Sequence, residues 1–152
     1  MKHLGIAMVK IEENEKKLLE AALKAMNNAY VLWGFRVGAA VLAEDGKIYG
    51  GCNVESWISG LGICAERCSI NHAILHGNRK IEKVAVVVDA DSQSEPKPCG
   101  ACLQHIYDFA KNSKIKIVMA KAENGEVSFE TVEVKSVEEL LPSPFRKMKN
   151  FG

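Results

Sequence analysis

The alternation of apolar and polar residues along the chain predicts three longer helices and one short helix. From residue 12 to 29, apolar side chains recur every three or four positions, which is typical of an amphipathic helix. Similar patterns predict helices over residues 64–75 and 100–111 and a short helix over 137–141. Gly77 lies just beyond the second of these patterns and is a suitable residue to end that helix.

The segments between these helices have the composition of β-strands. "FRVGAAVLAEDGKIYGGCNV" contains two β-rich runs separated by Asp45-Gly46, a dipeptide that favours a two-residue hairpin turn. "KVAVVVDA" is continuously apolar, as expected for a strand buried on both faces. "KIKIVMAK" and "VSFETVEV" are separated by a turn signal at Asn124-Gly125. Five strands are therefore predicted.

The order of these elements indicates the fold class. Helices and strands alternate through most of the chain, which contains no internal repeat, low-complexity tract or domain-sized linker. This order predicts one α/β layered domain over residues 1–152, with a mixed five-stranded sheet covered by helices on both faces. Residues 1–11 precede the first helical pattern and are expected to form a flexible N-terminal extension.

Composition narrows the classes of partner. The 152 residues include 20 basic and 19 acidic side chains, so the formal charge is +1 and gives no electrostatic reason to expect nucleic acid or an anionic membrane as a partner. The first ten residues lack the pattern of a secretory leader, and no apolar run is long enough for a membrane span. We therefore expect a cytoplasmic protein, in which the five cysteines act as ligands or free thiols rather than disulfide partners.

Two cysteines in the stretch "PKPCGACLQH" are candidates for chemistry. Cys99 and Cys102 lie where a loop is expected to enter a helix, and alone they fit half a zinc site, a redox dithiol or two ordinary helix-start thiols. Upstream, "GICAERC" places Cys64 and Glu66 at a second such junction. Helix N-termini stabilise thiolates, and two of them can meet at one edge of a sheet. The three cysteines could then share one metal ion.

Three thiolate ligands would leave one position of a tetrahedral zinc ion open, as in catalytic rather than structural zinc sites. A water made acidic by zinc needs a group that accepts its proton, and Glu66 lies two residues after the ligand Cys64. A ligand-x-Glu motif followed by Pro-Cys-x-x-Cys is the signature of zinc deaminases. "CAE" and "PCGAC" occur here in that order.

The sequence resembles the small cytidine deaminases. "FRVGAAV", "GCNVES", "GLGICAER", "PCGAC" and "ELLPSPF" occur in the order and spacing of that family, from the first helix to Phe145. The resemblance implies hydrolytic deamination of cytidine or deoxycytidine to uridine or deoxyuridine in pyrimidine salvage, with one Zn²⁺ per subunit. It also implies a homotetramer in which the substrate sites lie at subunit interfaces.

The resemblance further implies a role for individual residues. Cys64, Cys99 and Cys102 would bind zinc, and Glu66 would move protons to the base and to the departing ammonia. Arg67 would offset the excess negative charge of three thiolates on one zinc ion. The remaining matches are to substrate-binding positions: Phe35, Asn53, Glu55, Ala65 and Phe145.

Two segments depart from the family pattern. After Glu55 the family usually has Asn, Ala, Tyr and Pro where this chain has Ser56, Trp57, Ser59 and Gly60, and a usual Tyr-Ser pair is replaced by Leu32-Trp33. These changes lie near the expected pocket. They favour, as an alternative, a modified or non-nucleoside aminopyrimidine as the substrate.

Two interpretations from other functional classes remain open on sequence. A structural zinc site would need a fourth ligand, and Cys68 is the nearest candidate. A thiol redox protein would use Cys99 and Cys102 as a dithiol, but it would leave "CAER" without a role. Cys52 and Cys68 are expected in the core, and we assign no histidine to a metal.

Overall fold

The computed structural model describes residues 9–91 and 93–146. Within these ranges the chain forms the following helices and strands in order: α1 (Glu13–Met26), β1 (Val37–Ala43), β2 (Ile48–Cys52), α2 (Ala65–Leu75), β3 (Ile81–Asp89), α3 (Gly100–Phe109), β4 (Lys116–Glu123), β5 (Glu126–Ser136) and α4 (Val137–Leu140). Each of these elements was predicted from the sequence, with ends that differ by no more than three residues. None of the helices in these ranges has the length and apolar character needed to cross a bilayer.

The strands form one five-stranded sheet in the order β2-β1-β3-β4-β5. β3 and β4 are parallel, and the other neighbouring pairs are antiparallel. The sheet is therefore mixed, as predicted. β3 lies at its centre and is buried along most of its length, which explains its continuous apolar sequence.

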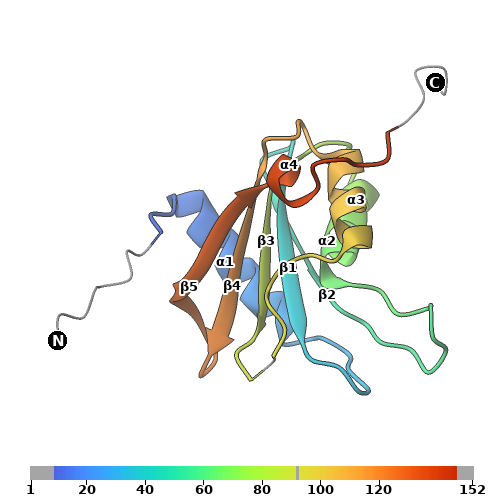
Figure 1. Ribbon diagram of the computed structural model, residues 1–152, viewed down its shortest axis with the longest axis vertical. Helices are drawn as coiled ribbons and strands as arrows, with labels where there is room; N and C mark the ends of the chain where they lie inside the picture. Colours follow the sequence, from blue (N-terminus) through green and yellow to red (C-terminus); the bar gives the residue numbers. More distant parts are fainter. Residues whose placement is uncertain (1–8, 92, 147–152) are drawn as a thin grey trace.

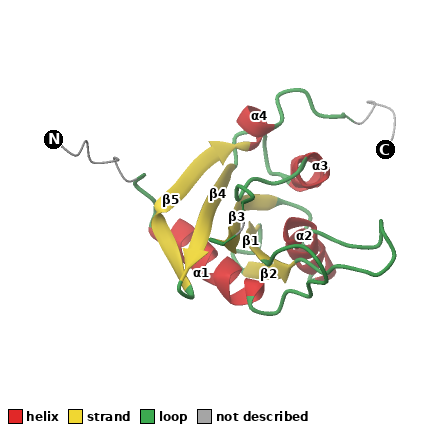
Figure 2. Ribbon diagram, turned by 60° about the horizontal axis from the view of Figure 1, so that its bottom comes forward, coloured by secondary structure: helices red, strands yellow, loops and turns green. Residues whose placement is uncertain are grey.

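The helices cover both faces of the sheet, as the predicted fold class requires (Figures 1 and 2). α1 packs on one face, where Leu18, Leu19, Ala22 and Met26 join sheet residues in one hydrophobic cluster. α2 and α3 lie side by side on the other face and share a second cluster with the short α4. The two helices that begin at cysteines are thus on the same face of the sheet.

The position of α1 is set by a polar N-terminus and a close contact with β1. The backbone N–H of Glu12 donates to Glu15 Oε2 at 2.9 Å, which caps the helix. A Cβ atom at Gly38 would collide with the carbonyl of Ala22, so glycine allows the helix to approach the strand. The helix ends at Met26, three residues before the predicted end. Ile11, within the expected N-terminal extension, packs partly against the core, and residues 1–8 lie outside the described part of the chain.

The first hairpin differs from the predicted two-residue turn. β1 ends at Ala43 and β2 begins at Ile48, so the connection is longer than Asp45-Gly46. Gly46 adopts a positive φ of 79°, and Asp45 accepts hydrogen bonds from the Lys47 N–H at 2.9 Å and the Tyr49 hydroxyl at 2.5 Å. These side-chain bonds stabilise the four-residue connection, residues 44–47, in which glycine takes the left-handed conformation.

Candidate metal centre and substrate pocket

Two helix N-termini bring the candidate metal ligands together. Cys64 is the N-cap residue of α2, and Cys99 is the N-cap residue of α3; both have extended backbone conformations. Cys102 lies in the first turn of α3 and is buried. Because α2 and α3 are neighbours on one face of the sheet, the unpaired N–H groups at both helix starts favour thiolates at the same place.

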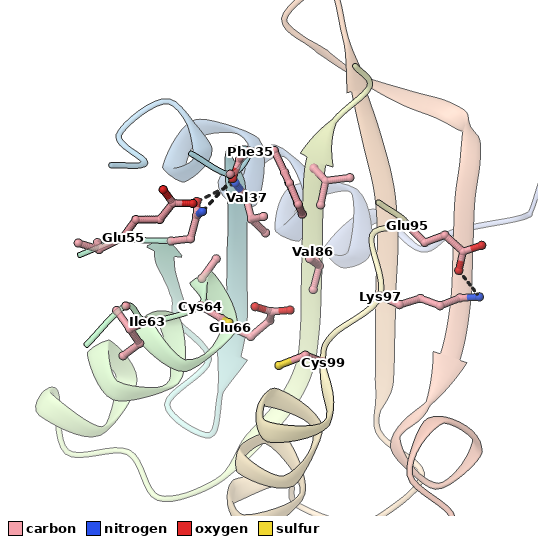
Figure 3. Close-up of a pocket in the computed structure, with 16 residues that line it drawn as sticks. Phe35, Val37, Glu55, Ile63, Cys64, Glu66, Val86, Glu95, Lys97 and Cys99 are labelled. Carbon is pink, nitrogen blue, oxygen red and sulfur yellow. Dashed lines mark hydrogen bonds and ion pairs between the residues drawn. The ribbon is translucent and has the colours of Figure 1, made fainter. Parts of the chain in front are cut away.

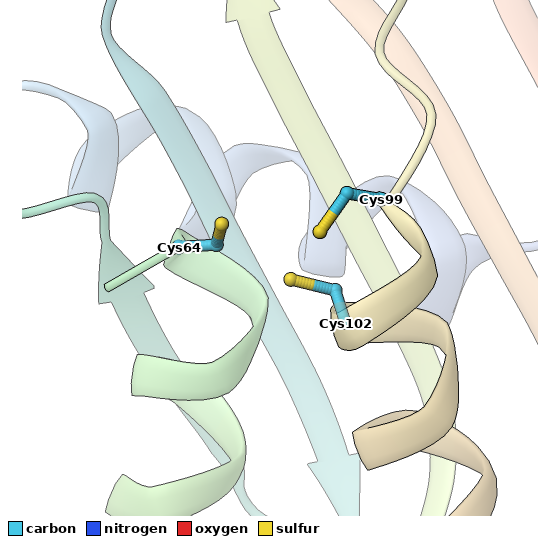
Figure 4. Close-up of side chains that lie close together, drawn as sticks. All are labelled: Cys64, Cys99 and Cys102. Carbon is cyan, nitrogen blue, oxygen red and sulfur yellow. The ribbon is translucent and has the colours of Figure 1, made fainter. Parts of the chain in front are cut away.

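The Sγ atoms of Cys64, Cys99 and Cys102 all lie within 4.8 Å of one another (Figure 4). Tetrahedral zinc with Zn–S bonds of 2.3 Å needs sulfur atoms roughly 3.8 Å apart, so small side-chain adjustments suffice for shared coordination. Among the residues that the structure describes, no other cluster of three His, Cys, Asp or Glu side chains could hold a metal ion. Cys68 is not part of the group, so the structure offers no fourth thiolate for a closed structural site.

Arg67 provides a positive charge beside the sulfur atoms. Its guanidinium donates a hydrogen bond from Nη2 to Cys64 Sγ at 3.5 Å. A hydrogen bond from Cys102, together with the Arg67 cation, lowers the pKa of Cys64 to about 5. The Nε atom of Arg67 is buried and has no hydrogen-bond partner in the described part of the chain. The guanidinium is thus held at the sulfur cluster rather than in solvent, as expected for a residue that offsets thiolate charge.

Glu66 is close to the metal group without belonging to it. The side chain is only 4% exposed, and burial raises the pKa of its carboxyl group. The Cys102 thiol donates to Glu66 Oε2 at 3.7 Å. A carboxyl group with a raised pKa is better suited than an ordinary glutamate to donate a proton as well as accept one.

A pocket of about 310 Å³ opens in front of these groups (Figure 3). Four of the five predicted substrate-binding residues border it: Phe35, Asn53, Glu55 and Ala65. Cys64, Glu66 and Cys99 border it as well. The structure therefore brings together two of the three candidate metal ligands, the acidic residue and most of the expected substrate contacts in one cavity.

Asn53 and Glu55 also hold the chain segment that carries Phe35. The Asn53 amide accepts from the Val37 N–H at 2.8 Å and donates to the Phe35 carbonyl at 2.9 Å. Glu55 Oε2 accepts hydrogen bonds from the backbone N–H groups of Leu32 and Trp33, which lower the pKa of this carboxyl group. A backbone hydrogen bond from Gly34 lowers the pKa of this carboxyl group further.

Several pocket residues were not identified from the sequence. One wall of the pocket is apolar and consists of Val37, Val86 and Val88. The sequence placed these valines in strands but did not indicate that they face a pocket. Glu95 and Lys97 border the pocket from the loop before α3, and their charged groups pair with each other at 2.9 Å. Figure 3 shows both charged ends directed away from Glu66 and Cys99. The acidic and basic groups of this loop therefore do not face the candidate metal.

Phe145 does not border the pocket of its own chain. Its side chain is 80% exposed, in the segment that follows α4. Trp33 and Trp57, two of the departures from the family pattern, are 65% and 76% exposed and form an edge-on ring pair with centroids 5.2 Å apart. The backbone N–H of Trp33 donates a hydrogen bond to Glu55, which borders the pocket. The tryptophan pair therefore lies beside the pocket.

A family model described as "Cytidine and deoxycytidylate deaminase zinc-binding region" matches residues 12–120. The chain belongs to this deaminase family. A cytidine deaminase of Sporosarcina psychrophila is 38% identical over 133 residues, which cover 87% of this chain and 91% of the relative. A blasticidin-S deaminase of Bacillus cereus is 26% identical and covers 90% and 96% of the two chains.

The fold of the family is shared as well. The crystal structure of cytidine deaminase from Burkholderia pseudomallei superposes with a TM-score of 0.74 at 33% identity, covering 89% of this chain and all of the other. The family assignment inferred from "CAER" and "PCGAC" is confirmed. This deaminase is a zinc enzyme, and its three clustered cysteines are suitable ligands for the metal.

Proposed function

We propose that this deaminase hydrolyses the amino group of cytidine and deoxycytidine in pyrimidine salvage, releasing ammonia and the corresponding uridine nucleoside. The observation that carries the proposal is the placement of Glu66, which is buried beside the three cysteines and borders the same pocket as Asn53 and Glu55. The pocket is the right size for a small ligand. It has a proton-transfer group at its base and polar groups near its entrance.

Cys64, Cys99 and Cys102 would hold the zinc ion, which when bound supplies an acidified water as the nucleophile. Glu66 accepts a proton from this water and delivers protons to N3 of the cytosine ring and to the amino nitrogen at C4. Oxygen from water then replaces nitrogen at C4, and ammonia leaves. Burial supports this role, because it keeps the carboxyl group of Glu66 partly protonated at higher pH than an exposed glutamate.

The other pocket residues would orient the substrate. Phe35 packs on the base, while the carboxylate of Glu55 and the remaining N–H of Asn53 bind ribose hydroxyl groups. Ala65 is the first residue of α2, where backbone N–H groups lack helical acceptors and can donate to O2 of the base. Arg67 would keep the sulfur cluster from becoming too electron-rich to activate water.

We further propose that the chain acts as a single-domain subunit of a cytoplasmic homotetramer. All five cysteines are free thiols, which suits a reducing compartment. Phe145 would reach the pocket of a neighbouring subunit. Its high exposure supports this role, because an exposed aromatic side chain that is unused by its own chain suits an interface.

A second candidate is a modified or non-nucleoside aminopyrimidine substrate. It is favoured by the exposed pair of Trp33 and Trp57, which adds aromatic surface beside the pocket entrance. The match to a blasticidin-S deaminase supports including that compound among the candidates.

The experiment is a turnover panel with zinc-loaded enzyme, in which the loss of the cytosine absorbance is followed for cytidine, deoxycytidine, 5-substituted cytidines and blasticidin S. A kcat/KM highest for cytidine or deoxycytidine supports the main proposal. A clear preference for a modified compound favours the second candidate. Absence of turnover with every compound, despite one zinc per subunit, contradicts both.

A further inference from the structure

Gln104 makes an unusual pair of hydrogen bonds to the C-terminal segment. Its Nε2 atom donates to the Phe145 carbonyl at 2.9 Å, and its Oε1 atom accepts from the Phe145 N–H at 2.9 Å. The side-chain amide thus pairs with both backbone groups of one residue, as a neighbouring strand would. Nε2 also donates to Asp108 Oδ1 at 2.9 Å within α3, a bond that does not involve Phe145.

These bonds fix the backbone of Phe145 but leave its ring uncovered. Phe145 is 80% exposed and does not border the pocket of its own subunit. Pro142 and Pro144 precede it and restrict the backbone of the same segment. A large aromatic side chain held in a defined place without a packing partner is costly for an isolated chain, unless another surface receives it.

Gln104 belongs to the helix that carries two of the candidate metal ligands. α3 begins after Cys99, includes Cys102 in its first turn and presents Gln104 two residues later. The segment after α4 passes over this helix (Figure 1). The ten-residue helix α3 therefore carries two of the three candidate metal ligands of its own subunit and also holds the backbone of Phe145.

We propose that Gln104 is a positioning residue, which holds Phe145 at the place and angle needed to complete the substrate pocket of a second copy of this chain. The inference rests on the proposed function, in which Phe145 reaches a neighbouring pocket. It adds that the backbone of Phe145 is aligned by Gln104 before assembly, so that little conformational freedom is lost when the ring docks. Gln104 itself has no contact with the substrate.

The variant Gln104→Met tests this role, because methionine keeps the side-chain length and helix propensity but removes the bonds to Phe145. Asp108→Ala is the matched control, since it removes only the bond that Gln104 makes within α3. With zinc-loaded enzyme and cytidine, Gln104→Met is expected to raise KM about tenfold while kcat changes less than about threefold. Asp108→Ala is expected to leave both constants unchanged.

Mixed oligomers show which subunit is affected. Gln104→Met and Glu66→Gln subunits are co-expressed with different tags, and oligomers that contain both are purified. The Glu66→Gln subunits have intact Gln104 and Phe145 but no proton-transfer group. Only the pockets of the Gln104→Met subunits can therefore react. A return of KM toward the wild-type value in these mixed oligomers supports action on the neighbouring pocket. A KM that stays raised shows that Gln104 acts on its own subunit and overturns the proposal.

Zinc content and oligomer size are measured for each variant. If Gln104→Met does not assemble, Gln104→Leu replaces it, because leucine likewise removes both bonds to the Phe145 backbone and has a similar helix propensity; the same rise in KM is then expected. A KM equal to that of wild type for the assembled variant overturns the positioning role alone. Wild-type enzyme that fails to deaminate cytidine would instead contradict the proposed function.

Discussion

The Sγ atom of Cys102 lies 3.7 Å from Oε2 of Glu66, so a metal-ligand candidate from α3 contacts the acidic residue of α2. The two residues are separated by 36 positions in the sequence and meet because their helices start side by side. The contact lies in the interior, where both side chains are almost fully shielded from solvent. A proton held by Glu66 is therefore next to the cluster of three cysteines and inside the pocket, with no layer of bulk water between them.

Replacing Glu66 by glutamine should separate catalysis from metal binding. Glutamine has nearly the same shape but cannot exchange protons, and general acid–base groups typically contribute 10²–10⁴-fold in rate. We expect kcat for cytidine to fall by about this factor, with zinc content unchanged because Glu66 is outside the group of three sulfur atoms. Steady-state kinetics and metal analysis measure the two effects. Full activity in a zinc-loaded Glu66→Gln enzyme would exclude the proposed role.

Arg67 offers a test of charge against hydrogen-bond geometry. Arg67→Gln removes the cation that contacts Cys64 Sγ at 3.5 Å, and loss of such a contact beside a metal typically costs roughly 10–100-fold in activity or metal affinity. Arg67→Lys keeps the charge but not the planar donor group, so we expect an intermediate loss. The measurements are kcat and zinc retention against a chelator. Equal losses in both variants would mean that geometry, rather than charge, is decisive.

Gly34 should be required for the orientation of Glu55. A Cβ atom at position 34 would collide with Oε1 of Glu55, whose carboxylate is proposed to bind the ribose. We expect Gly34→Ala to raise KM by on the order of 10- to 100-fold, because small displacements of a positioning group have effects of this size. Gly50→Ala is the control, since its new Cβ would have its nearest contact at 3.4 Å, with Ala25. Similar KM values in the two variants would contradict this view of the pocket.

The ion pair between Glu15 and Lys83, 3.1 Å apart, should make stability depend on pH. Burial raises the pKa of Glu15, but the Glu12 N–H, Lys83 and Lys116 outweigh it, so the pKa is below its ordinary value of 4.5. The ionised form therefore stabilises the fold above about pH 4.5, and this contribution disappears as the pH falls through the folded-state pKa.

Glu15→Gln should accordingly lower the free energy of unfolding by about 2 kcal/mol at pH 7, as for a hydrogen bond to a charged group. The difference from wild type should shrink below pH 4.5. Urea denaturation at several pH values measures it. Glu20→Gln, an exposed change in the same helix, should have an effect of less than about 0.5 kcal/mol. A difference between wild type and Glu15→Gln that is independent of pH would contradict the assignment.

The sequence predicted the elements well where the local pattern was strong. The continuous apolar run around Val86 predicted the buried central strand, and the spacing of Leu18, Leu19 and Met26 predicted α1. The sequence patterns did not predict the exact ends of some elements, such as the length of the first hairpin loop and the end of α1. Asp45 binds Lys47 and Tyr49 and makes the hairpin loop longer than its Asp-Gly signal suggested, and α1 ends at Met26 rather than Ala29.

By itself the sequence determined the chemical groups of the site. Two motifs with fixed internal spacing placed Cys64 and Glu66 on one helix start and Cys99 and Cys102 on another, because a helix fixes the relative positions of residues a turn apart. Only the tertiary structure decided what surrounds them: the wall of Val86 and Val88, the backbone bonds made by Glu55, and the hold of Gln104 on Phe145. These contacts join residues that are distant in the chain, and the packing of helices on the sheet, rather than any local pattern, brings them together.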